Sequence, residues 1–148
     1  MAQPTTSKFG KFRILLGNGA EPEVFTAPCG FTSKAFTLSK NLTEITIPDC
    51  DDPDAPFWIA RDTESLSASI TGEGLAAAES IQDWTDAAYS TDPVNAKVEI
   101  EFATGVLSFT GPFHIDSFNP SAEQGGRVQL SVSMQSDGQV TKLWTATP

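Results

Sequence analysis

The side chains best suited to acid–base chemistry are one histidine and a nearby aspartate. His114 and Asp116 stand two positions apart in a segment whose apolar residues alternate with polar ones. On a strand this spacing places both on one polar surface. Nucleophilic catalysis also requires an activated serine or cysteine, and the chain contains no Gly-x-Ser-x-Gly segment. We therefore predict no catalytic residue and do not expect an enzyme.

The side chains that could bind a metal ion are also few. Two cysteines, Cys29 and Cys50, make no recognisable zinc set with the single histidine. Residues 49–56 include four aspartates, whose oxygens suit calcium, but they lack the sixth-position glycine and closing glutamate of the best-known calcium loop. We predict no metal and no cofactor. The N-terminus shows no export signal, so we expect both cysteines to be reduced.

The same acidic stretch has the most unusual composition in the chain. Four carboxylates and two prolines within residues 49–56 exclude regular structure, and Phe57 and Trp58 follow at once. A solvated loop, a cation site and a docking arm all fit this composition. In a docking arm the two aromatic residues would anchor another subunit, because Trp and Phe are enriched in interface cores.

Length and charge narrow the classes of protein. A chain of 148 residues fits one domain with an independent core. Nineteen acidic residues against nine basic ones give a net charge of −10, which disfavours a positive patch for specific nucleic-acid binding. No eighteen apolar residues follow one another, so neither a membrane-spanning helix nor membrane binding is expected. We expect a soluble single-domain protein.

Only one stretch, about residues 75–90, has helical periodicity. Its apolar residues recur at the spacing of one helical stripe: Ala77, Ile81, Trp84 and Ala88. We predict a helix that contacts the core through Ile81, Trp84 and Ala88. Pro93 ends it, because proline disfavours helical geometry at the residue before it.

Most of the remaining chain alternates apolar and polar residues, which is the period of a half-buried strand. The longest runs are residues 94–102 and 127–135. Shorter strands are predicted at residues 12–16, 24–26, 36–38, 45–47, 66–70, 107–109, 113–115 and 140–144. Turns or breaks are predicted at Gly17-Asn18-Gly19, Lys40-Asn41, residues 71–74, Gly111-Pro112 and residues 118–126. These patterns predict a mainly β protein, an antiparallel β-sandwich or barrel with one flanking helix.

The order of several segments is informative beyond their periodicity. Residues 29–34, 47–56 and 67–74, the last just before the helix, resemble the major tail tube proteins of long-tailed bacteriophages and phage-derived gene transfer agents. The resemblance continues through residues 111–115 and 126–136. Each segment alone is a weak match, but several occur in the same order.

The resemblance implies a structural protein without an active site or cofactor. It implies a single tail tube domain over residues 1–148, with a flexible N-terminal arm at about 1–8 and an extended acidic loop at about 48–58. Such subunits form hexameric rings that stack into a hollow tube, and DNA crosses its lumen as a transient, non-specific cargo. The implied inter-ring contacts are residues 1–9 and Asp49, Asp51, Asp52, Asp54, Phe57 and Trp58.

The resemblance also implies partners and a location. The partners are further copies of the chain, a tail terminator, baseplate or distal tail proteins, and a tape-measure protein. The tube would belong to the virion and be assembled in the bacterial host cytoplasm. A lumen rich in carboxylates would repel phosphate, so a net charge of −10 suits such a conduit.

A carbohydrate-binding β-sandwich module is the alternative function. Such a module would expose two or three aromatic side chains on one sheet face. Here Phe57 and Trp58 are adjacent, whereas Trp84 and Trp144 have sequence settings typical of a core. The sequence therefore favours the structural role over glycan binding.

Overall fold

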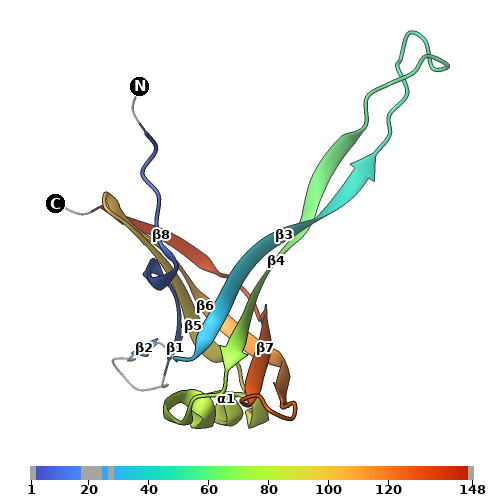
Figure 1. Ribbon diagram of the computed structural model, residues 1–148. Helices are drawn as coiled ribbons and strands as arrows, with labels where there is room; N and C mark the ends of the chain where they lie inside the picture. The colour runs from blue at the N-terminus through green and yellow to red at the C-terminus, as the bar shows by residue number, and fades with distance from the viewer. Residues whose placement is uncertain (1–2, 18–24, 27–28, 147–148) are drawn as a thin grey trace.

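The computed structural model describes residues 3–17, 25–26 and 29–146, and it is mainly β (Figure 1). The 3₁₀ turn η1 (Phe9–Lys11) precedes β1 (Phe12–Gly17) and β2 (Phe25–Thr26). Two long strands follow, β3 (Phe31–Ile45) and β4 (Ala60–Leu75), and then the helix α1 (Ala78–Tyr89). The chain ends with β5 (Val94–Phe102), β6 (Gly105–Ser121), β7 (Gln129–Ser136) and β8 (Thr141–Ala146).

The strands form one antiparallel sheet in the order β2-β1-β5-β6-β7-β4-β3, and β8 pairs with the first part of β6. The sheet curls until its two ends meet, since Lys34 Nζ on β3 donates a hydrogen bond of 2.7 Å to the Phe12 carbonyl on β1. Phe36 on β3 and Phe109 on β6 stack across the interior, with ring centroids 4.5 Å apart. The predicted barrel-like antiparallel fold is confirmed.

The core lies inside this curl, and α1 covers one end of it (Figure 1). Trp84 is 1% exposed and lies against Phe31, with ring centroids 5.3 Å apart. Ile81 packs against the core cluster and Ala88 is half-buried. The Ser80 hydroxyl donates to the Cys29 carbonyl at 3.0 Å, which ties the helix to the chain just before β3.

The predicted glycine hinge at residues 71–74 is wrong. β4 continues through it, and Gly72 and Gly74 pair with β7. Glycine is required there by close approach, because a Cβ on Gly72 would meet the Phe31 ring at 2.8 Å and one on Gly74 would meet the Gly30 carbonyl oxygen at 2.2 Å. The helix consequently starts at Ala78 and not at Leu75, whose N–H bonds to Gly30.

The predicted break at Lys40-Asn41 is also wrong. β3 is one strand that pairs with β4 along its length, and only a register shift between Asn41 and Leu42 marks the place. A bulge adds a residue without ending a strand. The alternation in β4 fails to predict burial at its outer part, where Leu66 is 63% exposed.

β6 is longer than predicted and its irregularity lies elsewhere. It passes through Gly111-Pro112, where a Cβ on Gly111 would meet the Gln139 carbonyl oxygen at 2.8 Å. The bulge opposite β7 falls between Ile115 and Ser117. Residues 118–121, predicted as loop, extend β6 and pair with β7.

The other strand predictions fare better. β5 has the predicted bounds 94–102, and β7 lies within two residues of its predicted ones. β1 pairs with β2, as the predicted hairpin requires, while the turn residues Asn18 and Gly19 lie outside the described residues. The core-like setting of Trp144 is wrong, because this side chain on β8 is 48% exposed.

Candidate functional site

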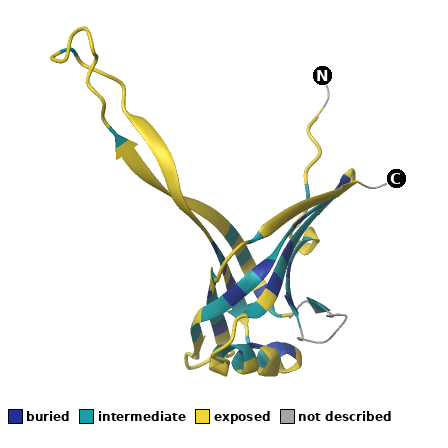
Figure 2. Cartoon of the chain, turned by 180° about the vertical axis from the view of Figure 1, so that it is seen from behind, coloured by how far each residue is buried: buried dark blue, intermediate teal, exposed yellow. Residues whose placement is uncertain are grey.

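The outer halves of β3 and β4 and their connecting loop project far beyond the curled sheet (Figures 1 and 2). We call residues 39–67 the arm. Within it, every residue except Ile45 and Ala55 is exposed. β7 joins β4 only from Ser69 onward, so the arm is a two-stranded ribbon. Such a ribbon is marginally stable alone in water and gains stability when another surface covers it.

Polar contacts hold the two strands of the arm together. The side chains of Asn41 and Thr43 donate to one carboxylate oxygen of Glu64 at 3.2 and 3.1 Å. The hydroxyls of Ser39 and Ser67 are 2.9 Å apart. These contacts are all exposed, and solvent-exposed pairs contribute little to stability.

The arm ends in the acidic loop predicted from sequence, here residues 46–59. This loop, which we call the arm tip, contains all six predicted contact residues: Asp49, Asp51, Asp52, Asp54, Phe57 and Trp58. The backbone N–H of Asp51 donates to Asp49 Oδ1 at 3.0 Å, and the N–H of Ala55 donates to the Asp52 carbonyl at 3.1 Å. The described residues contain no cluster of three or more side chains that could hold a metal.

The arm concentrates both charge and exposed apolar surface. It holds seven acidic and two basic residues, so half of the chain's net charge of −10 lies in it. Six large hydrophobic side chains are exposed along it: Leu42, Ile47, Phe57, Trp58, Ile59 and Leu66. Trp58 is 98% exposed. Exposed apolar surface on this scale marks an interaction site.

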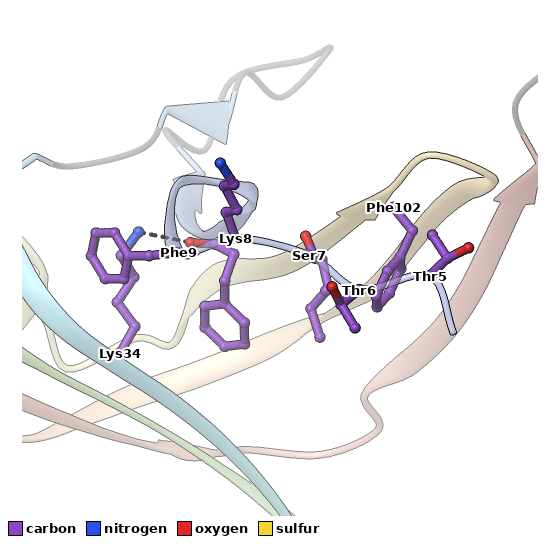
Figure 3. A pocket seen from close by; sticks show the side chains of 9 residues that line it. Thr5, Thr6, Ser7, Lys8, Phe9, Lys34 and Phe102 are labelled. Carbon is purple, nitrogen blue, oxygen red and sulfur yellow. Dashed lines mark hydrogen bonds between the residues drawn. The ribbon is translucent and has the colours of Figure 1, made fainter. Parts of the chain in front are cut away.

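A groove of 440 Å³ lies beside the N-terminal segment (Figure 3). One stretch of the groove is lined by Thr5, Thr6, Ser7 and Phe102. The other stretch is lined by Phe9 and Lys34. Phe12 and Ile100 complete its apolar lining. The Ser7 hydroxyl donates to the Glu101 carbonyl and holds this segment against β5.

Two lysines line the groove, and neither is paired with a carboxylate among the described residues. Lys34 Nζ lies 4.4 Å from the Phe9 ring centroid and bonds to a carbonyl, and it forms no ion pair with a described residue. Burial, followed by repulsion from Arg13, lowers the pKa of Lys34. Lys8 likewise has no ion pair within the described ranges.

Glu99 and Glu101 lie on β5, an interior strand of the sheet, and both take part in ion pairs. Arg13, directly opposite Glu99 on β1, binds Glu99 at 3.1 Å and Glu101 at 3.2 Å. Lys11 reaches Glu101 at 3.4 Å. Hydrogen bonds from Arg13 and then Lys11 lower the pKa of Glu101, and the bond to Glu99 raises that of Arg13. The cluster joins β1 to β5 across the sheet.

His114 binds Asp137, with Nε2 and Oδ2 3.1 Å apart, and not Asp116. Asp116 falls in the bulge of β6, which breaks the alternation that would have placed both residues side by side. Among the described residues, no serine or cysteine side chain forms a hydrogen bond with this pair. The two cysteines, Cys29 before β3 and Cys50 in the arm, are both exposed thiols.

Sequence reasoning missed the groove, because its lining comes from the N-terminal segment, β3 and β5. One signal was available. Residues 1–17 hold three basic residues and no acidic one, in a chain of net charge −10. A local excess of one charge favours association with a surface of the opposite sign.

A curled sheet that carries an exposed arm and an apolar groove presents two surfaces for contact with other chains. The model of the family described as "Phage tail tube protein" matches residues 7–142. The chain belongs to this family. It is therefore a structural subunit of a phage or gene transfer agent tail tube, part of the virion tail, and not an enzyme.

Similar solved structures share this fold. A protein of the native gene transfer agent virion has a TM-score of 0.70 at 17% identity, covering 97% of this chain and 100% of that chain. The tail of an empty gene transfer agent particle, with C6 symmetry, gives 0.71 at 17% identity, covering 92% and 98%. The SPP1 tail tube gives 0.65 at 15% identity, covering 96% and 80%. No curated protein sequence matches the chain.

The glycan-binding alternative is not favoured by the family. No helix in the described part of the chain has the length and apolar character needed to cross a membrane.

Proposed function

We propose that the chain forms hexameric rings that stack into a hollow tube and that DNA passes through the lumen to the recipient cell. The observation that carries the proposal is the arm, an exposed ribbon with Trp58 at its tip and half of the chain's net charge. A similar tail has C6 symmetry, which supports six copies in a ring. A ribbon that is marginal alone is stabilised by neighbouring copies.

The whole chain acts as one tail tube domain in this proposal, with the two contact segments predicted from sequence. The tip residues of the arm contact the adjacent ring: Asp49, Asp51, Asp52, Asp54, Phe57 and Trp58. The N-terminal segment, of which residues 3–8 are described and lie outside any helix or strand, contributes the second contact. The sheet edges that a single subunit leaves open pair between copies within a ring.

The outer face of β3, β4, β7 and β6 suits the lumen. Rows of aligned residues cross these four strands, such as Ala35, Thr71, Ser133 and Ser117. The neighbouring rows add mostly Ser, Thr, Gln and Asn, with Glu73 and His114 as the ionisable side chains. This face offers phosphate no lysine or arginine, so DNA slides past it without adhering.

Other proteins complete the particle. A tail terminator and baseplate or distal tail proteins close the two ends of the tube, and a tape-measure protein fills the lumen before DNA replaces it. Assembly takes place in the cytoplasm of the bacterial host. Support for such partners comes from two solved structures of similar fold, the tube-terminating cap and the baseplate of the anti-feeding prophage, at 14% and 11% identity.

Electron microscopy of the purified chain tests the proposal. We expect tubes of stacked rings at high protein concentration, with sixfold symmetry in averaged images. A chain that stays monomeric at every concentration, and also in the presence of a tape-measure protein, would contradict it. A monomer that binds glycans would instead support the alternative module.

A further inference from the structure

One histidine lies on the sheet face that we assign to the lumen. We propose that Asp137 holds His114 in a neutralised pair and thereby prevents the imidazole from binding DNA phosphate. The inference rests on the proposed function and deepens it, because it names the residue pair on this face that controls contact with the DNA backbone.

Strand register places His114 on this face. Along β6 it alternates with the core residue Phe113, and its neighbours across the ladders are Gln135 on β7 and then Ser69 on β4. Thr37 on β3 completes the row. These four side chains therefore lie on the side of the sheet opposite the core. The His114 side chain is 43% exposed, so a molecule in the lumen can reach it.

His114 is the one side chain in these described rows that can carry a positive charge. The strands β6 and β7 contain no lysine or arginine. Lys34 and Lys40 on β3 fall in the intervening rows, which belong to the core side of the sheet, and Arg61 on β4 lies in the arm. A cation on the luminal face would bind phosphate, as lysine and arginine do on DNA-binding surfaces.

Protonation of this histidine would change the character of the lumen. Histidine is the side chain whose charge ordinarily changes between about pH 5 and pH 8. In a ring, protonated His114 side chains without counter-ions would form a band of cations on the wall. Each contact with a phosphate would then oppose movement of the duplex.

Asp137 supplies the counter-ion. Its Oδ2 lies 3.1 Å from Nε2 of His114, in the turn directly after β7. The turn is held in place, because the backbone N–H of Asp137 donates to the Pro112 carbonyl at 2.9 Å. The pair has no net charge when the imidazole is protonated and one negative charge when it is neutral. In neither state does it present a net positive charge to DNA.

The other charged groups around His114 do not replace Asp137. Asp116 lies two positions along β6, and Asp92 lies two positions before Val94, whose partner in β6 is Phe113. The helix α1 packs against β6 and carries acids only: Glu79, Asp83 and Asp86. The ionisable residues of β5 and β8 lie opposite residues 106–110 of β6: Lys97, Glu99, Glu101 and Lys142. Among the described residues, Asp137 alone is bonded to the imidazole.

The test measures how much DNA assembled tubes retain. Open-ended tubes of the wild type and of Asp137→Asn are incubated with a short DNA duplex and sedimented, at about pH 5.5 and about pH 8. Wild-type tubes should retain little DNA at either pH. Asp137→Asn tubes should retain more at the lower pH, and the logarithm of their binding constant should fall more steeply with the logarithm of salt concentration. The slope should change by about 0.9 for each phosphate contacted.

Glu73→Gln is the matched control, because it removes one carboxylate from the same face and frees no cation. Its effect on DNA retention should be the same at both pH values. The double variant His114→Ala with Asp137→Asn removes the cation as well, so the pH-dependent part of the increase should disappear. Asp137→Ala is a second way to remove the carboxylate and should behave as Asp137→Asn.

The outcomes separate this inference from the function on which it rests. An effect of Asp137→Asn and Asp137→Ala that is equal at the two pH values, or that survives His114→Ala, would overturn the role of the pair and leave the tube function standing. A wild-type chain that never forms tubes would overturn both.

Discussion

Trp84 shows how one side chain fixes the helix to the sheet. It is 1% exposed, packs on Phe31, and its indole N–H has no hydrogen-bond partner among the described residues. Its contribution is therefore packing alone. We expect Trp84→Ala to lower the free energy of unfolding by about 3–5 kcal/mol, the range for truncating a buried aromatic residue.

Denaturant titration of the monomer measures this loss. Trp84→Phe is the informative companion, because it removes the unpartnered N–H while keeping a ring against Phe31, and its cost should be smaller. Tyr89→Ala on the exposed side of α1 should change stability by less than about 0.5 kcal/mol. A loss below about 1 kcal/mol for Trp84→Ala would show that the ring is not part of the core.

Glu101 gives a pH prediction at the same scale. Hydrogen bonds from Arg13 and Lys11 lower its pKa in the folded chain, so the folded state favours the ionised carboxylate. The resulting stability is present above the ordinary Glu pKa of about 4.3 and is lost as the pH falls through the lowered value. Glu101→Gln should therefore unfold at a lower temperature than wild type at pH 7, and the difference should shrink as the pH falls below the ordinary Glu pKa.

The matched control is Glu123→Gln, an exposed acid in the loop after β6 that is in no ion pair with a described residue. Its difference from wild type should be small over the same pH range. Because Glu101 is on the surface, its effect is modest and screened by salt. A Glu101→Gln difference that does not shrink as the pH falls below the ordinary Glu pKa would contradict the ion-pair explanation.

Prediction from sequence succeeds for Trp84 and fails for Trp144 for one physical reason. Periodicity tells which residues share a face of an element. The apolar stripe containing Trp84 lies on one face of the helix. It does not tell whether another element covers that face. Trp144 lies on β8, which pairs only with β6, and its nearest aromatic neighbour is Phe102 with ring centroids 6.4 Å apart.

A strand could be predicted with the right bounds where a proline or a glycine-containing turn lies at each end. β5 lies between Pro93 and the Thr104-Gly105 turn, and its predicted bounds hold. The strands predicted within β3, β4 and β6 are too short, because glycines and polar pairs are typical of turns. Gly72, Gly74 and Gly111 instead allow another strand or ring to approach closely, a reason that exists only in the folded chain.

A deletion in the loop of the arm tests the role of this element. Deleting residues 51–56 removes six of the fourteen residues that join β3 to β4 and leaves the ladder pairs in place. Because these residues contact little of the body, the monomer should keep its unfolding temperature. Stacking into tubes should be impaired, as seen by electron microscopy and sedimentation.

A replacement of residues 51–56 by Gly and Ser of equal length separates chemistry from length. We expect this variant to stack as poorly as the deletion, since it also removes Asp51, Asp52 and Asp54. Normal tubes from the deletion would refute the arm as a docking segment.

At the scale of the whole molecule, the separation of charge predicts how assembly responds to salt. The arm is strongly acidic and the first 17 residues are basic. Raising the ionic strength from 0.1 to 1 M shortens the screening length from about 10 to about 3 Å. If attraction between these two regions of neighbouring copies dominates, the concentration needed for tube formation should rise with salt, as light scattering would show.

A variant with Lys8→Glu and Lys11→Glu should lose this salt sensitivity. Tubes of the wild type that become easier to form at 1 M salt would show that repulsion between subunits outweighs attraction between these regions. The chain carries enough like charge for that outcome, with a net −10.

The site could be predicted in part at this scale. The acidic and aromatic composition of the tip, together with the family resemblance, identifies the arm. The groove escapes because Phe9, Lys34 and Phe102 are distant in sequence and meet only when the ends of the sheet curl together. Composition can reveal a functional segment that is continuous in sequence. A surface formed by three separate segments can be found only from the folded structure.

The position of α1 at one end of the molecule, opposite the arm, has a consequence for growth (Figure 1). Copies related only by rotation keep a common direction, so their annulus has two chemically different rims. A cylinder built from such annuli inherits that directionality. Its two extremities therefore present different binding surfaces, and a capping protein can distinguish head from tip without any additional label.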